Sequence, residues 1–417
     1  MEGMKNSSIG QLLLIGVPGP EIDLAQAEII RRVQPGGFIL FGRNIKTPTQ
    51  LRKLIDTLRE LSSTEPMITI DQEGGRVSRL KLLGNEPPNV RQLRESGNKD
   101  LIRRHGEITG QLLKLFGFNL DLCPVLDIAF DEEADNSLRG RCYGTTAEQV
   151  IELATIFNDA LRATGVMSCG KHFPGYSMAS GDPHYDLSAL PRPLAELEQH
   201  ELKVFRHFAG NRTFSKFATD DVGQGILGTQ KPQGIYIPEV SSTGVTKACT
   251  SGVEFRKGSV DSMMIGHISF AELDSSGLPA SLSPTIITKL LREQMGFNGL
   301  VMSDDFDMGA ILNNYSFEDT LRLGLAAGND MLMICHRTEL AERAALYLET
   351  LPQDQIDRAL HYIAEFKARM VPPDVFSETK FHELDQKVWE LRVDTLGAEA
   401  AAERSPEDGK RSPVEVY

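Results

Sequence analysis

Short apolar runs alternate with longer amphipathic stretches along most of the chain, and each run ends in polar or glycine residues. This pattern indicates strands buried on both faces and joined by helices as parallel neighbours. The expected strands are Gln11–Val17, Gly37–Phe41, Pro66–Asp71, Leu120–Asp127, Val166–His172, Ser262–His267, Leu300–Asp304 and Asp330–Cys335. The expected helices are Ile22–Val33, Thr49–Leu61, Asp100–Phe116, Ala147–Ala163, Leu194–Phe208, Ser283–Met295, Glu318–Ala327 and Glu339–Leu348.

Eight alternating pairs predict an α/β fold of the (β/α)8 barrel type, because a closed parallel sheet needs apolar strands and an outer layer of helices. A doubly wound open sheet is the alternative, but no Gly-x-Gly-x-x-Gly motif follows the first strand. We therefore expect a single catalytic barrel over residues 1–393.

Two segments of the chain are not needed for a minimal barrel. Residues 210–258 are rich in Gly, Ser and Thr, contain one strand-like island at Ile235–Val240, and are too long for an ordinary loop. Because they follow a helix and precede a strand, we expect a structural or interaction insert on the N-terminal face. A last helix is expected around Phe381–Arg392, and residues 394–417 have a composition that predicts disorder.

The formal charge of −14 argues against nucleic acid or an anionic membrane as a partner, because both attract basic surfaces. A small soluble substrate is expected instead. Five scattered cysteines indicate neither a disulfide framework nor a zinc site, and fit a reducing compartment. The apolar run Leu12–Ile15 is too short for a signal peptide or a membrane span, so we expect a cytoplasmic protein.

Polar side chains gather at the C-terminal ends of the expected strands, where the mouth of a barrel lies. The run Asp71–Arg79 offers a carboxylate, arginines and a glycine pair, although a tight turn with an internal ion pair is an alternative. Lys171 and His172 end the fifth strand, and Arg141 is a further candidate for holding a substrate oxygen. His267 follows the sixth strand, where we favour a packed structural histidine over a contact residue.

Asp182 and His184 stand two residues apart in the loop after the fifth strand. A carboxylate at this spacing can fix the tautomer of an imidazole and stabilise its protonated form, which suits a general acid and base. The alternative is that Asp182 closes an Asx turn beside a solvated His184.

The run Ser303–Asp307 places three carboxylates at the end of the seventh strand. Adjacent residues there point in different directions, so we expect only one of Asp304 and Asp305 to face the pocket. That carboxylate could act as a nucleophile or bind Mg²⁺. No second acidic cluster with phosphate-binding glycines accompanies it, and we expect neither a metal nor another cofactor.

Together these motifs resemble the family 3 glycoside hydrolases, specifically the single-barrel β-N-acetylhexosaminidases that release N-acetylglucosamine from cell-wall fragments. The resemblance rests on an ordered set that spans nearly the whole barrel. Its members are Gly36–Asn44, Ile70–Val77, Asn119–Asp121, Pro124–Asp127, Lys171–Gly175, Pro279–Ser283 and Ser303–Asp305.

The resemblance implies that Asp304 is the nucleophile, His184 the general acid and base, and Asp182 its orienting partner. In a retaining mechanism, Asp304 forms a glycosyl-enzyme while His184 protonates the departing oxygen, and water then opens the intermediate with His184 as base. A carbohydrate substrate and a role in peptidoglycan turnover are also implied. The residues implied to bind the terminal sugar are Asp71, Arg79, Arg141, Lys171 and His172.

The chain departs from the family pattern in its acid/base loop and its insert. Tyr176–Ser177 replaces the usual His/Asp-Gly, Pro183 stands where the dyad usually carries Ser, and residues 210–258 are foreign to compact members. No second domain of the kind that supplies a glutamate acid/base in larger β-glucosidases is expected, which favours His184. The alternatives are a β-glucosidase or β-xylosidase on the same scaffold, or an inactive sugar-binding barrel.

Overall fold

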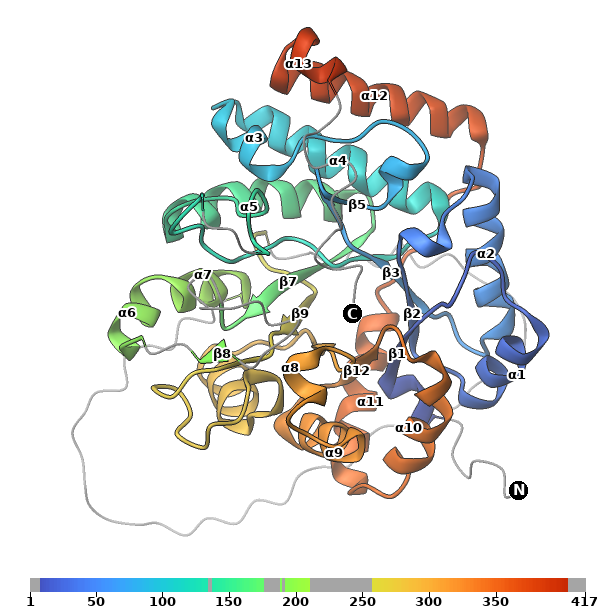
Figure 1. The fold of residues 1–417 in the computed structure, drawn as a ribbon, viewed down its shortest axis with the longest axis vertical. Coiled ribbons are helices and arrows are strands. Elements are labelled where there is room, and N and C mark those ends of the chain that lie inside the picture. Colours follow the sequence, from blue (N-terminus) through green and yellow to red (C-terminus); the bar gives the residue numbers. More distant parts are fainter. Residues whose placement is uncertain (1–7, 134–136, 176–187, 190–191, 211–256, 404–417) are drawn as a thin grey trace.

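The computed structural model describes residues 8–133, 137–175, 188–189, 192–210 and 257–403 (Figure 1). Eight parallel strands close into a barrel in chain order, and the last strand pairs with the first. This arrangement confirms the predicted (β/α)8 barrel. The barrel strands are β1 (Leu13–Gly16), β2 (Gly37–Leu40), β3 (Met67–Ile70), β6 (Leu120–Asp121), β7 (Met167–Phe173), β9 (Ser262–Ile265), β11 (Leu300–Asp305) and β12 (Met331–Ile334).

Helices surround the barrel and cover the outer face of its strands (Figure 1). In α2 (Pro48–Leu61), the Thr47 hydroxyl accepts a hydrogen bond from the N–H of Gln50, and Pro48 occupies the first turn. Together these two residues fix where the helix begins. The outer helices are α1 (Leu24–Val33), α2 (Pro48–Leu61), α4 (Lys99–Phe116), α5 (Ala147–Ala163), α6 (Leu194–Gln199), α7 (Glu201–Phe208), a π-type helix (Thr285–Gln294), α9 (Phe317–Ala327) and α10 (Ala341–Leu348).

The barrel strands are buried on both faces, since one set of side chains fills the barrel and the other packs under the helices. Strand β2 is an example of burial on both faces, because its consecutive residues Phe38, Ile39 and Leu40 are all at most 1% exposed. The near-continuous apolar runs in the sequence therefore reflect strands without a solvent-facing side.

Several elements were not anticipated. The helix expected over Leu194–Phe208 is broken at His200, whose φ and ψ of −117° and −91° are not helical. Short 3-10 turns occupy Ile9–Leu12, Gly42–Asn44, Leu80–Leu82, Ala280–Leu282 and Thr338–Leu340. The other additional elements are the hairpin β4 (Gln72–Gly74) with β5 (Val77–Ser78), β8 (Ser188–Ala189) paired with β10 (Ile268–Ser269), α3 (Val90–Glu95), α8 (Gly309–Leu312) and α11 (Gln353–Lys367).

The C-terminal part of the described chain is helical for longer than expected. Helix α12 (Glu378–Leu396) packs along α4, and α13 (Ala398–Ala402) follows it (Figure 1). The Arg392 guanidinium donates to the carbonyl of Ala401 at 3.0 Å and ties the two helices together. The predicted disorder is therefore wrong for residues 394–402, because alanine-rich composition also favours helix. The remainder of the expected tail, 404–417, lies outside the described residues.

The described ends of the insert lie at the N-terminal end of β9. Gly210 closes the turn after α7, and the N–H of Val260, just before β9, donates to the carbonyl of Phe208 at 3.1 Å. Both ends are thus on the face where we expected the insert, whose residues 211–256 lie outside the described part. Among the helices that the structure describes, none is both long enough and apolar enough to cross a membrane.

Candidate active site

Oppositely charged side chains form a buried network at the C-terminal ends of β3 and β7. The Lys171 Nζ atom lies 2.6 Å from Asp71 Oδ1 and 2.7 Å from Glu73 Oε1. Arg141 binds Glu73 through two hydrogen bonds of 2.7 Å, and Arg79 Nη2 lies 3.8 Å from Asp71 Oδ2. All five side chains are at most 4% exposed. Four of the five residues predicted to bind the sugar therefore meet in one network.

The charges in this network stabilise one another. Burial by itself would raise the pKa of Glu73, but Arg141 and Lys171 outweigh it and hold that pKa well below its ordinary value. Burial would lower the pKa of Lys171, but Asp71 and Glu73 raise it above the ordinary value. Both groups therefore stay charged at neutral pH, and the network presents fixed polar groups that could hold sugar hydroxyls.

A further carboxyl, that of Asp121, lies fully buried beside the network. Its Oδ1 accepts the N–H of Gln72 at 3.1 Å, and its Oδ2 has no hydrogen-bond partner among the described residues. Burial raises the pKa of Asp121 well above its ordinary value, against the opposing effect of Lys171. Burial therefore favours the protonated form of Asp121, beside a network of charged groups.

The hairpin of β4 and β5 brings Glu73 into the site. Gly74 and Gly75 at its turn have φ values of +107° and +54°, which favour glycine. A Cβ on Gly74 would lie 2.6 Å from the carbonyl of Pro88, so the chain also needs glycine for packing. Glu73 was not predicted as a site residue, although its position two residues after Asp71 matches the two-residue side-chain period of an extended chain.

His172 is oriented by a carboxylate that the sequence analysis did not assign. Its Nδ1 lies 2.7 Å from Asp127 Oδ2, and the same oxygen accepts the backbone N–H of His172 at 3.1 Å. The imidazole is 6% exposed and Asp127 is completely buried. Asp127 therefore favours the tautomer with the proton on Nδ1, which leaves Nε2 as the ring's other polar atom.

The two adjacent acids at the end of β11 have different environments. Asp305 is 3% exposed, and its Oδ1 accepts the N–H groups of Asp307 and Cys335 at 2.9 and 3.1 Å. Burial, followed by the charge of Asp307, raises the pKa of Asp305 well above its ordinary value. Asp304 is the only residue of β11 that stays partly exposed, and its Oδ1 accepts the N–H of Asp305 at 2.8 Å. Of these two acids, Asp304 is therefore the more accessible.

His267 is a packed histidine. Its Nδ1 lies 2.7 Å from the Ser281 hydroxyl and its Nε2 lies 2.9 Å from the carbonyl of Asp305. The ring is 1% exposed and stacks on Phe306 at a centroid distance of 5.8 Å. It supports the backbone next to Asp304, in line with the structural role that we favoured.

Asp182 and His184 belong to residues 176–187, which lie outside the described part of the chain. The described residues on either side of this segment lie at the C-terminal ends of β7 and β9. Gly175 follows β7 directly, and β8 pairs with β10 just after the end of β9. Within the described ranges, no group of three His, Cys, Asp or Glu side chains could hold a metal ion.

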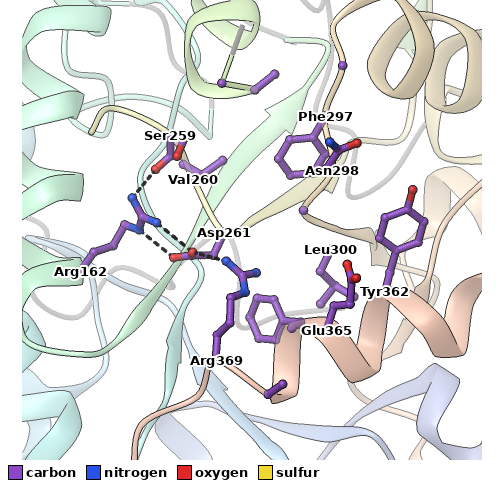
Figure 2. A pocket seen from close by; sticks show the side chains of 16 residues that line it. Arg162, Ser259, Val260, Asp261, Phe297, Asn298, Leu300, Tyr362, Glu365 and Arg369 are labelled. Atoms are coloured by element: carbon purple, nitrogen blue, oxygen red, sulfur yellow. Dashed lines mark hydrogen bonds and ion pairs between the residues drawn. The ribbon is translucent and has the colours of Figure 1, made fainter. Parts of the chain in front are cut away.

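A cavity of about 550 Å³ lies at the opposite, N-terminal end of the barrel (Figure 2). Its charged wall is a paired cluster in which Arg162 and Arg369 both contact Asp261, at 2.8 and 3.1 Å. Asp261 also accepts the N–H of Ser168 at 3.1 Å. Asp261 thus holds both arginines, and the cluster joins α5, β9 and the end of α11.

The site and the barrel define a class of protein before any relative is considered. Fixed cations and carboxylates at the C-terminal mouth of a (β/α)8 barrel are typical of enzymes that act on small polar substrates. The model of the glycosyl hydrolase family 3 N-terminal domain matches residues 4–213 and 253–366. The chain therefore belongs to glycosyl hydrolase family 3 and is a glycoside hydrolase.

Curated relatives and solved structures agree with this assignment. A β-hexosaminidase from Chromobacterium violaceum is 30% identical, over 82% of this chain and 84% of the relative. One from Tolumonas auensis is 29% identical, over 78% and 82%. The structure of a family 3 β-N-acetylglucosaminidase from Paenibacillus sp. FPU-7 matches with a TM-score of 0.75 and 26% identity, over 94% of this chain and 69% of that one.

Proposed function

We propose that the protein is a retaining exo-glycosidase that releases terminal β-linked N-acetylglucosamine. The observation that carries the proposal is the partial exposure of Asp304 at the C-terminal end of β11, where the neighbouring Asp305 is buried. The names of the relatives supply the sugar, since they are β-hexosaminidases and β-N-acetylglucosaminidases.

In this mechanism Asp304 attacks the anomeric carbon while His184, supported by Asp182, protonates the departing oxygen. The Asp304–glycosyl bond is then broken by water, with His184 acting as the base. The Lys171 network holds the terminal sugar so that its anomeric carbon stays within reach of Asp304.

We further propose that the substrate is a peptidoglycan fragment and that the protein acts in the cytoplasm. Four of the five cysteines are free and buried in the described structure, which suits a reducing compartment. The negative net charge of the chain suits a small glycan rather than a nucleic acid.

The test compares aryl β-N-acetylglucosaminide, β-glucoside and β-xyloside as substrates. We expect kcat/KM to favour the first by at least about 100-fold, and Asp304→Asn to abolish turnover while N-acetylglucosamine still binds. A preference for glucoside or xyloside would assign the alternative sugar on the same scaffold. Sugar binding without turnover in the unsubstituted chain would identify an inactive binding barrel.

A further inference from the structure

A buried carboxylate outside the sugar-binding network has no role in the mechanism described above. Glu201 begins α7, and its side chain is completely buried. A carboxylate removed from water costs free energy unless it is paired and hydrogen-bonded. Burial raises the pKa of Glu201, and Arg192 opposes that rise. Some structural or functional role must therefore offset the free-energy cost of burying Glu201.

One oxygen of Glu201 is held by Arg192. The Arg192 guanidinium donates to Glu201 Oε1, and it also lies 4.9 Å from the ring centroid of Phe130. Phe130 belongs to the loop after β6, and it packs edge-on against His200 at a centroid distance of 5.6 Å. Glu201 Oε2 has no hydrogen-bond partner among the described residues. The pair thus joins α7 to the chain just before α6.

The aliphatic part of Glu201 packs directly on the backbone of Gly175. A Cβ added to Gly175 would lie 2.8 Å from Glu201 Cγ and 2.9 Å from its Cβ. Gly175 has a φ of +110°, and its N–H donates to the carbonyl of His172 at 2.7 Å. Glu201 therefore also fixes the turn that follows the sugar-binding end of β7.

Gly175 and Arg192 stand on either side of the chain segment that contains Asp182 and His184. We propose that Glu201 is a positioning residue for the acid/base step, because it holds Arg192 and the Gly175 backbone at a fixed separation. This inference rests on the proposed function, in which His184 is the proton donor. A misplacement of about 1 Å at a reacting group can cost about 100-fold in rate, so fixed ends on this segment matter for proton transfer.

The experiment uses Glu201→Gln in the full chain, with two aryl β-N-acetylglucosaminides. One carries a 2,4-dinitrophenyl leaving group, which departs without a proton, and the other carries a phenyl group, which needs one. We expect kcat/KM for the phenyl substrate to fall by at least about 30-fold and that for the dinitrophenyl substrate by less than about 3-fold. His184→Ala should show the same split and gives the reference pattern.

Glu198→Gln is the matched control, because Glu198 lies exposed on α6 close to Glu201 in the chain. It should leave both values of kcat/KM unchanged. If Glu201→Gln does not fold, Arg192→Gln removes the same ion pair from the partly exposed partner and should give the same split.

Equal losses on the two substrates, or no loss on either, would overturn the role of Glu201 while leaving the proposed function intact. A chain that hydrolyses neither substrate before any substitution would contradict the proposed function itself. The two failures are thus separated by the activity of the unsubstituted protein.

Discussion

Lys171 Nζ lies 2.6 Å from Asp71 Oδ1, and this contact joins the ends of two barrel strands that are about one hundred residues apart in the chain. Both side chains are at most 4% exposed. The contact brings a cation and a carboxylate together at the mouth, where a sugar hydroxyl can meet both donor and acceptor.

Substitution of Lys171 by Met should damage both activity and stability. The change leaves Asp71 without its closest cation and Glu73 with Arg141 alone, and breaking a buried ion pair costs about 3–5 kcal/mol. We expect kcat/KM to fall by at least about 100-fold and Tm to fall clearly. Lys387→Met, on the exposed face of α12, is the control and should change neither. A Lys171 variant with unchanged kcat/KM would contradict its assignment to the sugar site.

The adjacent acids of β11 should respond differently to the same chemical change. Asp305→Asn keeps the oxygen that accepts from Asp307 and Cys335, and burial already raises the pKa of Asp305 well above its ordinary value. We expect it to retain kcat/KM within about 10-fold, whereas Asp304→Asn should lose at least about 1000-fold. Steady-state kinetics with an aryl β-N-acetylglucosaminide measures both. The opposite ranking would transfer the nucleophile to Asp305.

Asp121→Asn should stabilise the protein increasingly as the pH rises. A carboxyl whose pKa is raised by folding must take up a proton on folding above its unfolded pKa of about 3.8, which costs about 1.4 kcal/mol per pH unit up to the folded pKa. Asparagine avoids this cost and keeps the acceptor for Gln72. The difference in Tm between variant and parent should therefore grow as the pH rises above 5. A constant difference would mean that Asp121 is ionised in the fold.

His105 should make the protein less stable in mild acid. Its imidazole is 1% exposed, neither ring nitrogen has a hydrogen-bond partner among the described residues, and burial lowers its pKa to about 4. The unfolded chain binds the proton more tightly, so stability is complete above pH 6.5 and is lost as the pH falls toward 4. The shift corresponds to about 3 kcal/mol. Urea unfolding of His105→Met at several pH values should show a weaker loss, and an identical loss would exclude His105 as a cause.

The barrel could be predicted from the sequence because its signal is repeated. Eight apolar runs alternate with eight amphipathic stretches, and most of the strands are shorter than predicted, as β6 (Leu120–Asp121) shows. The shorter elements lack such repetition. Helix α3 (Val90–Glu95) depends on the cap that Asn89 provides, and the break at His200 is a local backbone conformation within a continuous amphipathic pattern.

The motifs place Asp71, Arg141 and Lys171 near one another at the barrel mouth, but they do not reveal the long-range pairs that complete the network. Glu73 lies in the motif Ile70–Val77, and Asp127 ends the motif Pro124–Asp127. Their roles depend on contacts with Arg141 and His172, which are distant in the chain. Sequence spacing does not report which carboxylate a buried cation will meet.

The most direct test of the account is to trap the glycosyl-enzyme with a fluorinated N-acetylglucosaminyl fluoride. This reagent forms the covalent intermediate, which water then hydrolyses only slowly. Mass spectrometry of the intact chain should show one sugar adduct, and peptide mapping should place it on Asp304. The adduct should be absent from Asp304→Asn. A sugar attached to a different residue, or none on a chain that hydrolyses the substrate with retention, would contradict the central claim.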